Sequence, residues 1–214
     1  DLNSSGVTAI SEPNTTTSFT IRLTSSPSGP VTLAFESDDA TECALSPTSF
    51  VFDNTNWNNI QTITIIAQDD LIADGAQTCN VTARLLGGTP SEYVGVPNPS
   101  FPVTVNDNES IGINVPTGVT VSEGGVGQDL IFTLASEPTN PVTITLTPDA
   151  QCNLSVGSVI LDSTNWNTGT GTGRVTVTAV DDFVIEGGHN CSVTTGTTTS
   201  IGAYNGINPA DVTV

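Results

Sequence analysis

The acidic residues with the clearest potential for chemistry occur side by side, in two places. AQDDLIADGAQT (Ala67–Thr78) and AVDDFVIEGGHN (Ala179–Asn190) each contain two adjacent aspartates, three apolar or small residues, a third acid and a glycine. Adjacent like charges need a counter-charge, but the chain has 3 basic residues, all arginines, against 22 acids. A hard cation would supply that charge. Calcium, which accepts about six to eight oxygens in irregular loops, fits better than magnesium, which requires a tight octahedron.

Further acids could join each aspartate pair. The third acid of each stretch lies close enough in sequence to return to the same site, and acids of other loops would join if the ends of the first, third, sixth and last strands meet at one pole. The alternative is that the aspartates only form solvated turns, in which Asp is common. The predicted metal ligands are Glu12, Asp38, Asp39, Asp69, Asp70, Asp74, Asp107 and Glu109 in the first half, and Glu123, Asp149, Asp181, Asp182 and Glu186 in the second.

The acidic stretches belong to an internal repeat that covers the chain. SFVFDNTNWNN (Ser49–Asn59) is echoed by SVILDSTNWNT (Ser158–Thr168), and GVTAISEP near the start is echoed by GVTVSEGG. An inserted TGTGTG in the second copy shifts the offset by three residues before its acidic stretch. We therefore predict two domains, 1–108 and 109–214, joined by the short junction NDNES.

Period-two alternation predicts the elements that position these acids. Segments such as PVTLAFES and QTITIIAQ in the first copy, and PVTITLTP and RVTVTAV in the second, alternate Val, Ile, Leu and Phe with Thr and other polar residues. Pro, Gly, Asn and Asp interrupt them at short intervals. This pattern indicates an all-β chain, with an antiparallel β-sandwich of about seven strands in each repeat.

Taken together, these motifs resemble Calx-beta repeats. The resemblance rests on SEP or SEGG, the apolar strand, NWN, the double aspartate with its later acid and glycine, Y-x-G, and VTVNDNE. It implies two tandem immunoglobulin-like Greek-key sandwiches with calcium at one end. The ligands it implies are Glu12, Asp69, Asp70, Asp74, Asp107 and Glu109 in the first repeat, and Glu123, Asp181, Asp182 and Glu186 in the second. The second repeat stops at Val214 before any acidic run, so its calcium site is expected to be weaker or absent.

The four cysteines fall two to a repeat, at equivalent places. The economical pairing is therefore Cys43 with Cys79 and Cys152 with Cys191, and the alternative is four buried thiols. A zinc site is disfavoured because the chain has a single histidine, His189, and no closely spaced cysteine pair. Disulfides predict an extracellular or cell-surface location.

Composition and motifs exclude several functions. The formal net charge of -19 argues against nucleic acid and anionic membranes as partners, and no apolar run is long enough to span a bilayer. Paired acids also occur in glycosidases, but no insertion interrupts either sandwich to form a cleft. His189 has no recognisable triad partner. Trp57 and Trp166 of the NWN motifs could face carbohydrate, but we expect them to pack under a loop. The protein is therefore predicted not to be an enzyme.

Three functions are compatible with these features. The first is a calcium-stiffened structural subunit of an extracellular fibre or filament, assembling head to tail with copies of itself. In that arrangement Asp1–Ser5 of one subunit docks at the C-terminal pole of the next. The second is an adhesin or lectin-like module that binds a surface ligand, with other surface proteins as partners. The third is a calcium sensor within a larger host protein.

Overall fold

The described part of the chain is built almost entirely of β-strands. The structure is a computed structural model, and it describes residues 2–3, 9–88, 90–182, 184–185 and 187–214. Helical structure in these residues is limited to two 3-10 turns, η1 (Ser91–Tyr93) and η2 (Gly171–Gly173). Neither of these turns could serve as a membrane-spanning helix. The all-β class predicted from the alternating pattern is confirmed.

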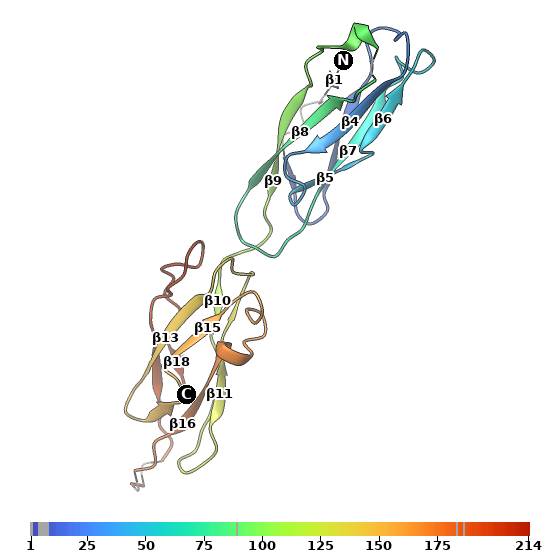
Figure 1. The fold of residues 1–214 in the computed structure, drawn as a ribbon. Coiled ribbons are helices and arrows are strands. Elements are labelled where there is room, and N and C mark those ends of the chain that lie inside the picture. The colour runs from blue at the N-terminus through green and yellow to red at the C-terminus, as the bar shows by residue number, and fades with distance from the viewer. Residues whose placement is uncertain (1, 4–8, 89, 183, 186) are drawn as a thin grey trace. The chain divides into compact units, whose positions relative to one another are not determined.

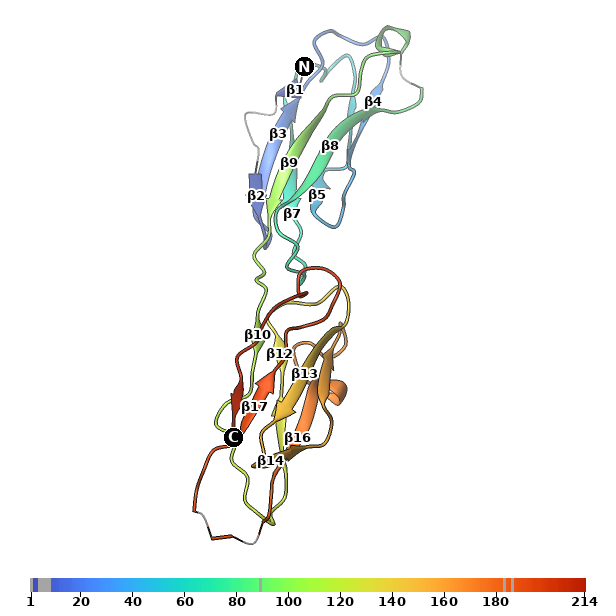
Figure 2. The same cartoon turned by 90° about the vertical axis from the view of Figure 1, so that its left-hand side faces the viewer.

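Contacts divide the chain into two compact units. The first contains Asp1–Asp70 and Asp74–Asn108, and the second contains Glu109–Val214 and Leu71–Ala73. Figures 1 and 2 show the strands of each unit.

The first unit is a sandwich of two β-sheets. Its four-stranded sheet has the order β1 (Leu2–Asn3), β3 (Thr16–Ile21), β7 (Gln61–Ala67), β5 (Cys43–Ser46). Its five-stranded sheet has the order β2 (Ala9–Ser11), β9 (Ser100–Asn106), β8 (Gln77–Leu85), β4 (Val31–Ser37), β6 (Ser49–Phe52).

Alternating side chains fill the space between these sheets. On β7, Ile63 and Ile65 are buried while the residues between them are partly exposed, because successive side chains of a strand point to opposite faces. Phe19 of one sheet meets Phe35 of the other edge to face, with ring centroids 5.8 Å apart. This contact joins the two layers within the core.

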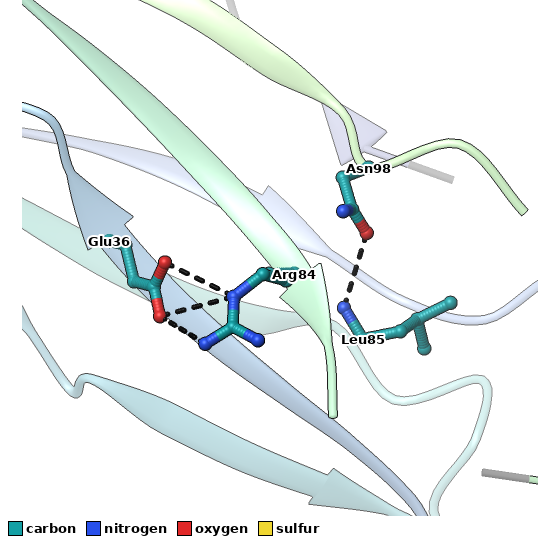
Figure 3. Close-up of polar contacts among 4 residues, drawn as sticks. All are labelled: Glu36, Arg84, Leu85 and Asn98. Atoms are coloured by element: carbon teal, nitrogen blue, oxygen red, sulfur yellow. Dashed lines mark hydrogen bonds and ion pairs between the residues drawn. The ribbon is translucent and has the colours of Figure 1, made fainter. Parts of the chain in front are cut away.

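The outer face of the five-stranded sheet carries polar pairs (Figure 3). Arg84 of β8 donates to Glu36 of β4 through Nη2 at 2.6 Å and through Nε at 3.2 Å. Both side chains are about half exposed, so the pair fixes side-chain positions more than it stabilises the fold. Beyond it, the Leu85 N–H donates to Oδ1 of Asn98 at 3.3 Å.

The second unit repeats this plan, and several of its strands are shorter. One sheet has the order β15 (Ser158–Leu161), β13 (Val142–Pro148), β17 (Ser192–Thr195), β18 (Val212–Thr213). The opposite layer comprises β11 (Gln128–Ile131), β16 (Arg174–Ala179), β14 (Cys152–Leu154), with β10 (Ile113–Asn114) and β12 (Thr133–Leu134) paired beside it.

The inserted TGTGTG segment explains why β11 and β12 are separate where β3 is continuous. Between them, the Phe132 N–H donates to the Gly173 carbonyl at 3.1 Å instead of joining a strand ladder. Gly169 has a φ of +60°, and a Cβ there would lie 2.4 Å from the Phe132 oxygen. Only glycine allows the inserted turn to approach this closely.

Equivalent polar contacts recur in the two units. Tyr93 donates its hydroxyl to the Ser25 carbonyl at 2.7 Å, and Tyr204 donates to the Ser136 carbonyl at 3.2 Å. In both NWN turns the first asparagine accepts a hydrogen bond from an aspartate N–H three residues earlier. The two tryptophans pack against the cores of their units, as the packing alternative predicts.

Each unit contains one disulfide, which confirms the predicted pairing. The bonds are Cys43–Cys79 and Cys152–Cys191, and all four cysteines are buried. In each unit the bond links one sheet layer to the other.

Candidate metal centre

Strand directions bring the acidic loops of the first unit to one pole. β2 runs parallel to β9, with Ser11 opposite Asn106, so both strands end at this pole. β8 is antiparallel to β9 and to β4, so β8 starts here and β4 ends here. In the other layer β7 ends and β5 begins at the same place, where the Gln68 N–H donates to the Glu42 carbonyl at 2.8 Å. We call this end of the first unit the acidic pole.

Three carboxylates gather at the acidic pole. Oxygens of Glu42, Asp70 and Asp74 all lie within 4.8 Å of one another. Asp70 follows β7, Asp74 precedes β8, and Glu42 precedes β5, so the three come from separate strand ends. Asp70 and Asp74 belong to the sequence-predicted ligand set, whereas Glu42 does not.

Glu42 is the most unusual member of this group. Only 6 % of its surface is exposed, and in the described part of the chain the pKa of its carboxylate is shifted by burial and by other acids, with no hydrogen bond among the causes. Burial raises its pKa above the usual value, and the charges of Asp74, Asp39, Asp70 and Asp107 raise it further. A buried carboxylate surrounded by other carboxylates is unfavourable unless it is protonated or neutralised by a cation.

Glu12 and Asp107, two of the predicted ligands, lie beside this group. Their carboxylate oxygens are within 4.8 Å of each other. The pKa of Glu12 is raised by burial and by the charges of Asp70, Glu42 and Asp107, and a hydrogen bond from the Asn108 backbone opposes the shift. Asp107 accepts the Gly75 N–H at 2.7 Å, which fixes the loop after Asp74.

Other predicted ligands of the first unit are engaged in hydrogen bonds at the same end. Asp38 accepts both the backbone N–H and the side-chain amide of Asn80, at 2.6 and 2.7 Å. Asp39 accepts the N–H and hydroxyl of Thr41. These bonds lower the pKa of both aspartates. The structure therefore uses Asp38 and Asp39 to shape turns, and neither belongs to a carboxylate group.

Two further predicted ligands of the first repeat are Asp69 and Glu109. Asp69 is exposed, and its Oδ1 accepts the Asn108 side-chain amide at 3.3 Å. Glu109 follows the boundary after Asn108 and is counted with the second unit.

The second unit has a different set of residues at the equivalent end. Gln151, which precedes Cys152 as Glu42 precedes Cys43, puts a neutral amide where the first unit has its buried acid. Its Oε1 lies 2.9 Å from Nε2 of His189. Glu123, Asp181 and Asp182 are exposed, and the Asp182 carboxylate accepts the Val184 N–H at 2.9 Å. Glu186 lies outside the described residues.

Asp149 is equivalent to Asp38, and its carboxylate also accepts a backbone N–H from the residue that follows the second cysteine of its unit. It accepts the Ser192 N–H at 2.7 Å and the Gln151 N–H at 2.9 Å, and these bonds lower its pKa. It is grouped with Cys152 and Cys191, but those sulfurs form the disulfide and are not available to a metal. In the described part of the second unit, no group of three carboxylates is found.

The second unit also differs in its opening segment. The residues equivalent to β2, around Val119–Ser122, form no strand with β18, whereas β2 pairs with β9 in the first unit. A groove lies between this segment and the residues Thr213 and Val214. The two repeats have thus diverged both in backbone pairing and in charge.

In the described part of the chain, Arg84 and Arg174 form ion pairs with acids that do not belong to the acidic pole. Arg84 binds Glu36, and Arg174 binds Asp129 in the second unit. Arg22 follows β3 at the end where Ile21 pairs with Gln61, whereas Thr16 at the other end pairs near the pole. The length of β3 separates Arg22 from the pole by roughly 20 Å.

Glu42 escaped sequence reasoning because no repeated motif marks it. The second repeat has glutamine at this position, so comparing the two halves removes the signal. Glu42 lies directly before the first cysteine, where a strand begins at the acidic pole. This position is the feature that would have identified it.

No protein-family model and no curated protein match this sequence. Similar solved structures include the calcium binding domain CBD12 of CALX1.1, at 14% identity over 92% of this chain and 79% of that chain, with a TM-score of 0.38. CBD12 from CALX1.2 is similar at 11% identity over 92% and 80%, with a TM-score of 0.37. The YadV chaperone is similar at 7% identity over 100% and 98%, with a TM-score of 0.38. Likeness at this level transfers neither a metal site nor a partner to this chain.

Proposed function

We propose that the first unit binds a divalent cation at its acidic pole, that calcium is the cation, and that the chain is a non-enzymatic structural part of an extracellular protein. The observation that carries the proposal is the buried carboxylate of Glu42 within 4.8 Å of Asp70 and Asp74. At neutral pH a bound cation is the simplest source of the missing positive charge.

The ligand chemistry favours calcium over other metals. The group offers carboxylate oxygens only, which suit hard cations and exclude a thiolate site. The carboxylates come from loops between strands, and Glu12 and Asp107 stand next to the central three. Calcium accepts a large and irregular set of oxygens, whereas magnesium requires six in a regular octahedron.

The structural and extracellular parts of the proposal have separate support. Two buried disulfides fit an extracellular or periplasmic protein. A cation that joins loops from both sheets would stiffen the sandwich, which suits a mechanical role. Head-to-tail assembly of copies stays a prediction, and its docking segment includes Asp1, Ser4 and Ser5, which lie outside the described residues.

Calcium titration of Glu42→Gln tests the site. We expect wild-type protein to bind calcium in isothermal titration calorimetry, and the variant to lose at least about tenfold in affinity because a charged ligand is removed. Glu92→Gln is the matched control. Glu92 lies in η1 at the opposite end of the unit and accepts the Ser28 N–H, a bond that glutamine can keep.

Metal-free stability gives a second, independent readout. In EDTA, Glu42→Gln should melt at a higher temperature than wild type, because it removes a buried charge that faces like charges. In saturating calcium the order should reverse. A variant that melts lower than wild type in both conditions would show that Glu42 serves packing and not cation binding.

A further inference from the structure

The Cys43–Cys79 disulfide lies directly beneath the acidic pole. Cys43 is the residue after Glu42 and begins β5, and its N–H donates to the Asp39 carbonyl at 3.1 Å. Cys79 lies in β8, shortly after Asp74. The bond therefore joins the two chain segments that supply two of the three central carboxylates.

The disulfide and the carboxylate group span the same two layers. β5 belongs to the four-stranded sheet and β8 to the five-stranded sheet. Glu42 and Asp70 adjoin strands of the first sheet, and Asp74 adjoins β8 of the second. A cation held by all three would resist separation of the sheets at the point where the disulfide also resists it.

Hydrogen bonds connect the chain segments around the Cys43–Cys79 disulfide. The Gln68 N–H donates to the Glu42 carbonyl at 2.8 Å, which ties the start of β5 to the loop of Asp70. Asp38 accepts the N–H of Asn80, the residue after Cys79, at 2.6 Å. Movement of either cysteine would therefore move a carboxylate-bearing segment.

We propose that the Cys43–Cys79 disulfide and the cation site are energetically coupled, so that a bound cation protects this disulfide from reduction and reduction weakens cation binding. The inference rests on the proposed cation site. Reciprocity follows because both equilibria depend on the same packing of the two sheets, and coupling free energy is the same in either direction.

The second unit provides an internal control. Cys152 begins β14 in one layer and Cys191 precedes β17 in the other, so this disulfide also joins two sheets. Gln151 replaces the buried acid, and no group of three carboxylates adjoins the bond in the described residues. Its reduction should not respond to calcium.

Reduction by dithiothreitol in native buffer tests the coupling. A thiolate of the reagent attacks one cysteine sulfur and releases the other as a thiolate. The second thiol of the reagent then closes a cyclic disulfide and frees the remaining cysteine, so two electrons pass from the reagent to the protein. Quenching with iodoacetamide at intervals records the free thiols.

The arginines allow both bonds to be followed in one sample. Trypsin cleaves after Arg22, Arg84 and Arg174, so residues 23–84 carry Cys43 and Cys79, while Cys152 and Cys191 fall in the next two peptides. We expect saturating calcium to slow alkylation of the 23–84 peptide about tenfold or more relative to EDTA, and to leave the other two unchanged. At a calcium concentration that saturates wild type but not Glu42→Gln, the variant should lose that protection.

Three results would overturn the coupling. Equal reduction of Cys43–Cys79 with and without calcium, in protein that binds calcium by calorimetry, would reject the coupling and leave the proposed function intact. Failure of wild-type protein to bind calcium at all would reject both. Equal slowing of both disulfides would show a general effect of calcium on the reagent or the fold, and would also reject the specific coupling.

Discussion

At the scale of single residues, Glu42 and Glu12 set the electrostatics of the acidic pole. Burial and neighbouring acids raise the pKa of both, so in the folded state each binds its proton more tightly than in the unfolded chain. An acid whose pKa is higher in the folded than in the unfolded state stabilises the fold below its unfolded pKa. This contribution is lost as pH rises through its folded pKa. Hydrogen-bonded aspartates such as Asp38 act in the opposite sense, because their pKa is lowered.

Metal-free protein should therefore be most stable at mildly acidic pH. We expect the melting temperature of the first unit in EDTA to fall as pH rises above 4.5, the ordinary pKa of glutamate. In stronger acid it should also fall, because the aspartates whose pKa is lowered in the folded state become protonated. Circular dichroism melts between pH 3 and pH 8 measure this, on a scale set by about 4–8 °C per kcal/mol for a domain of this size.

The double variant Glu12→Gln, Glu42→Gln is the control for this pH profile. In this variant the melting temperature should decline less above pH 4.5, and its decline in stronger acid should be unchanged. Calcium should reverse the slope in wild type, because protons compete with the metal for the carboxylates. A wild-type profile that rises steadily to pH 8 in EDTA would contradict the assignment.

At the scale of elements, the short strands and their turns decide how far each repeat follows the common plan. The inserted turn of the second unit approaches Phe132 so closely that a Cβ at Gly169 would meet its carbonyl oxygen at 2.4 Å. The positive φ of Gly169 adds backbone strain for any other residue.

Gly169→Ala should destabilise the second unit by about 2–4 kcal/mol, the sum expected for an unfavourable φ and an overpacked contact. Gly157→Ala is the matched control, since a Cβ there meets nothing within 4 Å. Chemical denaturation followed by intrinsic fluorescence measures both. Equal stability of the two variants would show that the turn relaxes without cost.

The sequence predicted the strands of this molecule best, and it predicted the contacts between side chains least well. Alternation of Val, Ile and Thr located β4, β7 and β16 because these strands are buried on one face, and the repeat located the disulfides. Glu42 was missed, because its role depends on burial beside strand ends that are distant in sequence. The turn roles of Asp38 and Asp149 depend on Asn80 and Ser192, contacts that no local pattern reveals.

At the scale of the whole molecule, the two units should respond differently to calcium. The first carries the buried acid and its neighbours, and the second has Gln151 at the equivalent place. Binding at about 100 times Kd adds about 2.7 kcal/mol to the unit that binds.

Differential scanning calorimetry should therefore resolve two transitions of which calcium shifts one upward. The Cys152→Ser, Cys191→Ser variant identifies the transition of the second unit. Loss of its disulfide should lower only the temperature of the transition that calcium does not shift, because it removes about 4 kcal/mol of stability in the chain-entropy model. Upward shifts of both transitions in calcium would show that the second unit also binds the cation.

The parallel pairing of β2 with β9 in the first unit has a mechanical consequence. When the two ends of that unit are pulled apart, these strands slide lengthwise against each other, so the hydrogen bonds between them share the load and must fail together. The second unit has no such pairing between Val119–Ser122 and β18, so its opening segment can peel away under a smaller force. A chain under tension would therefore extend in two steps, with the first unit acting as the link that holds longest.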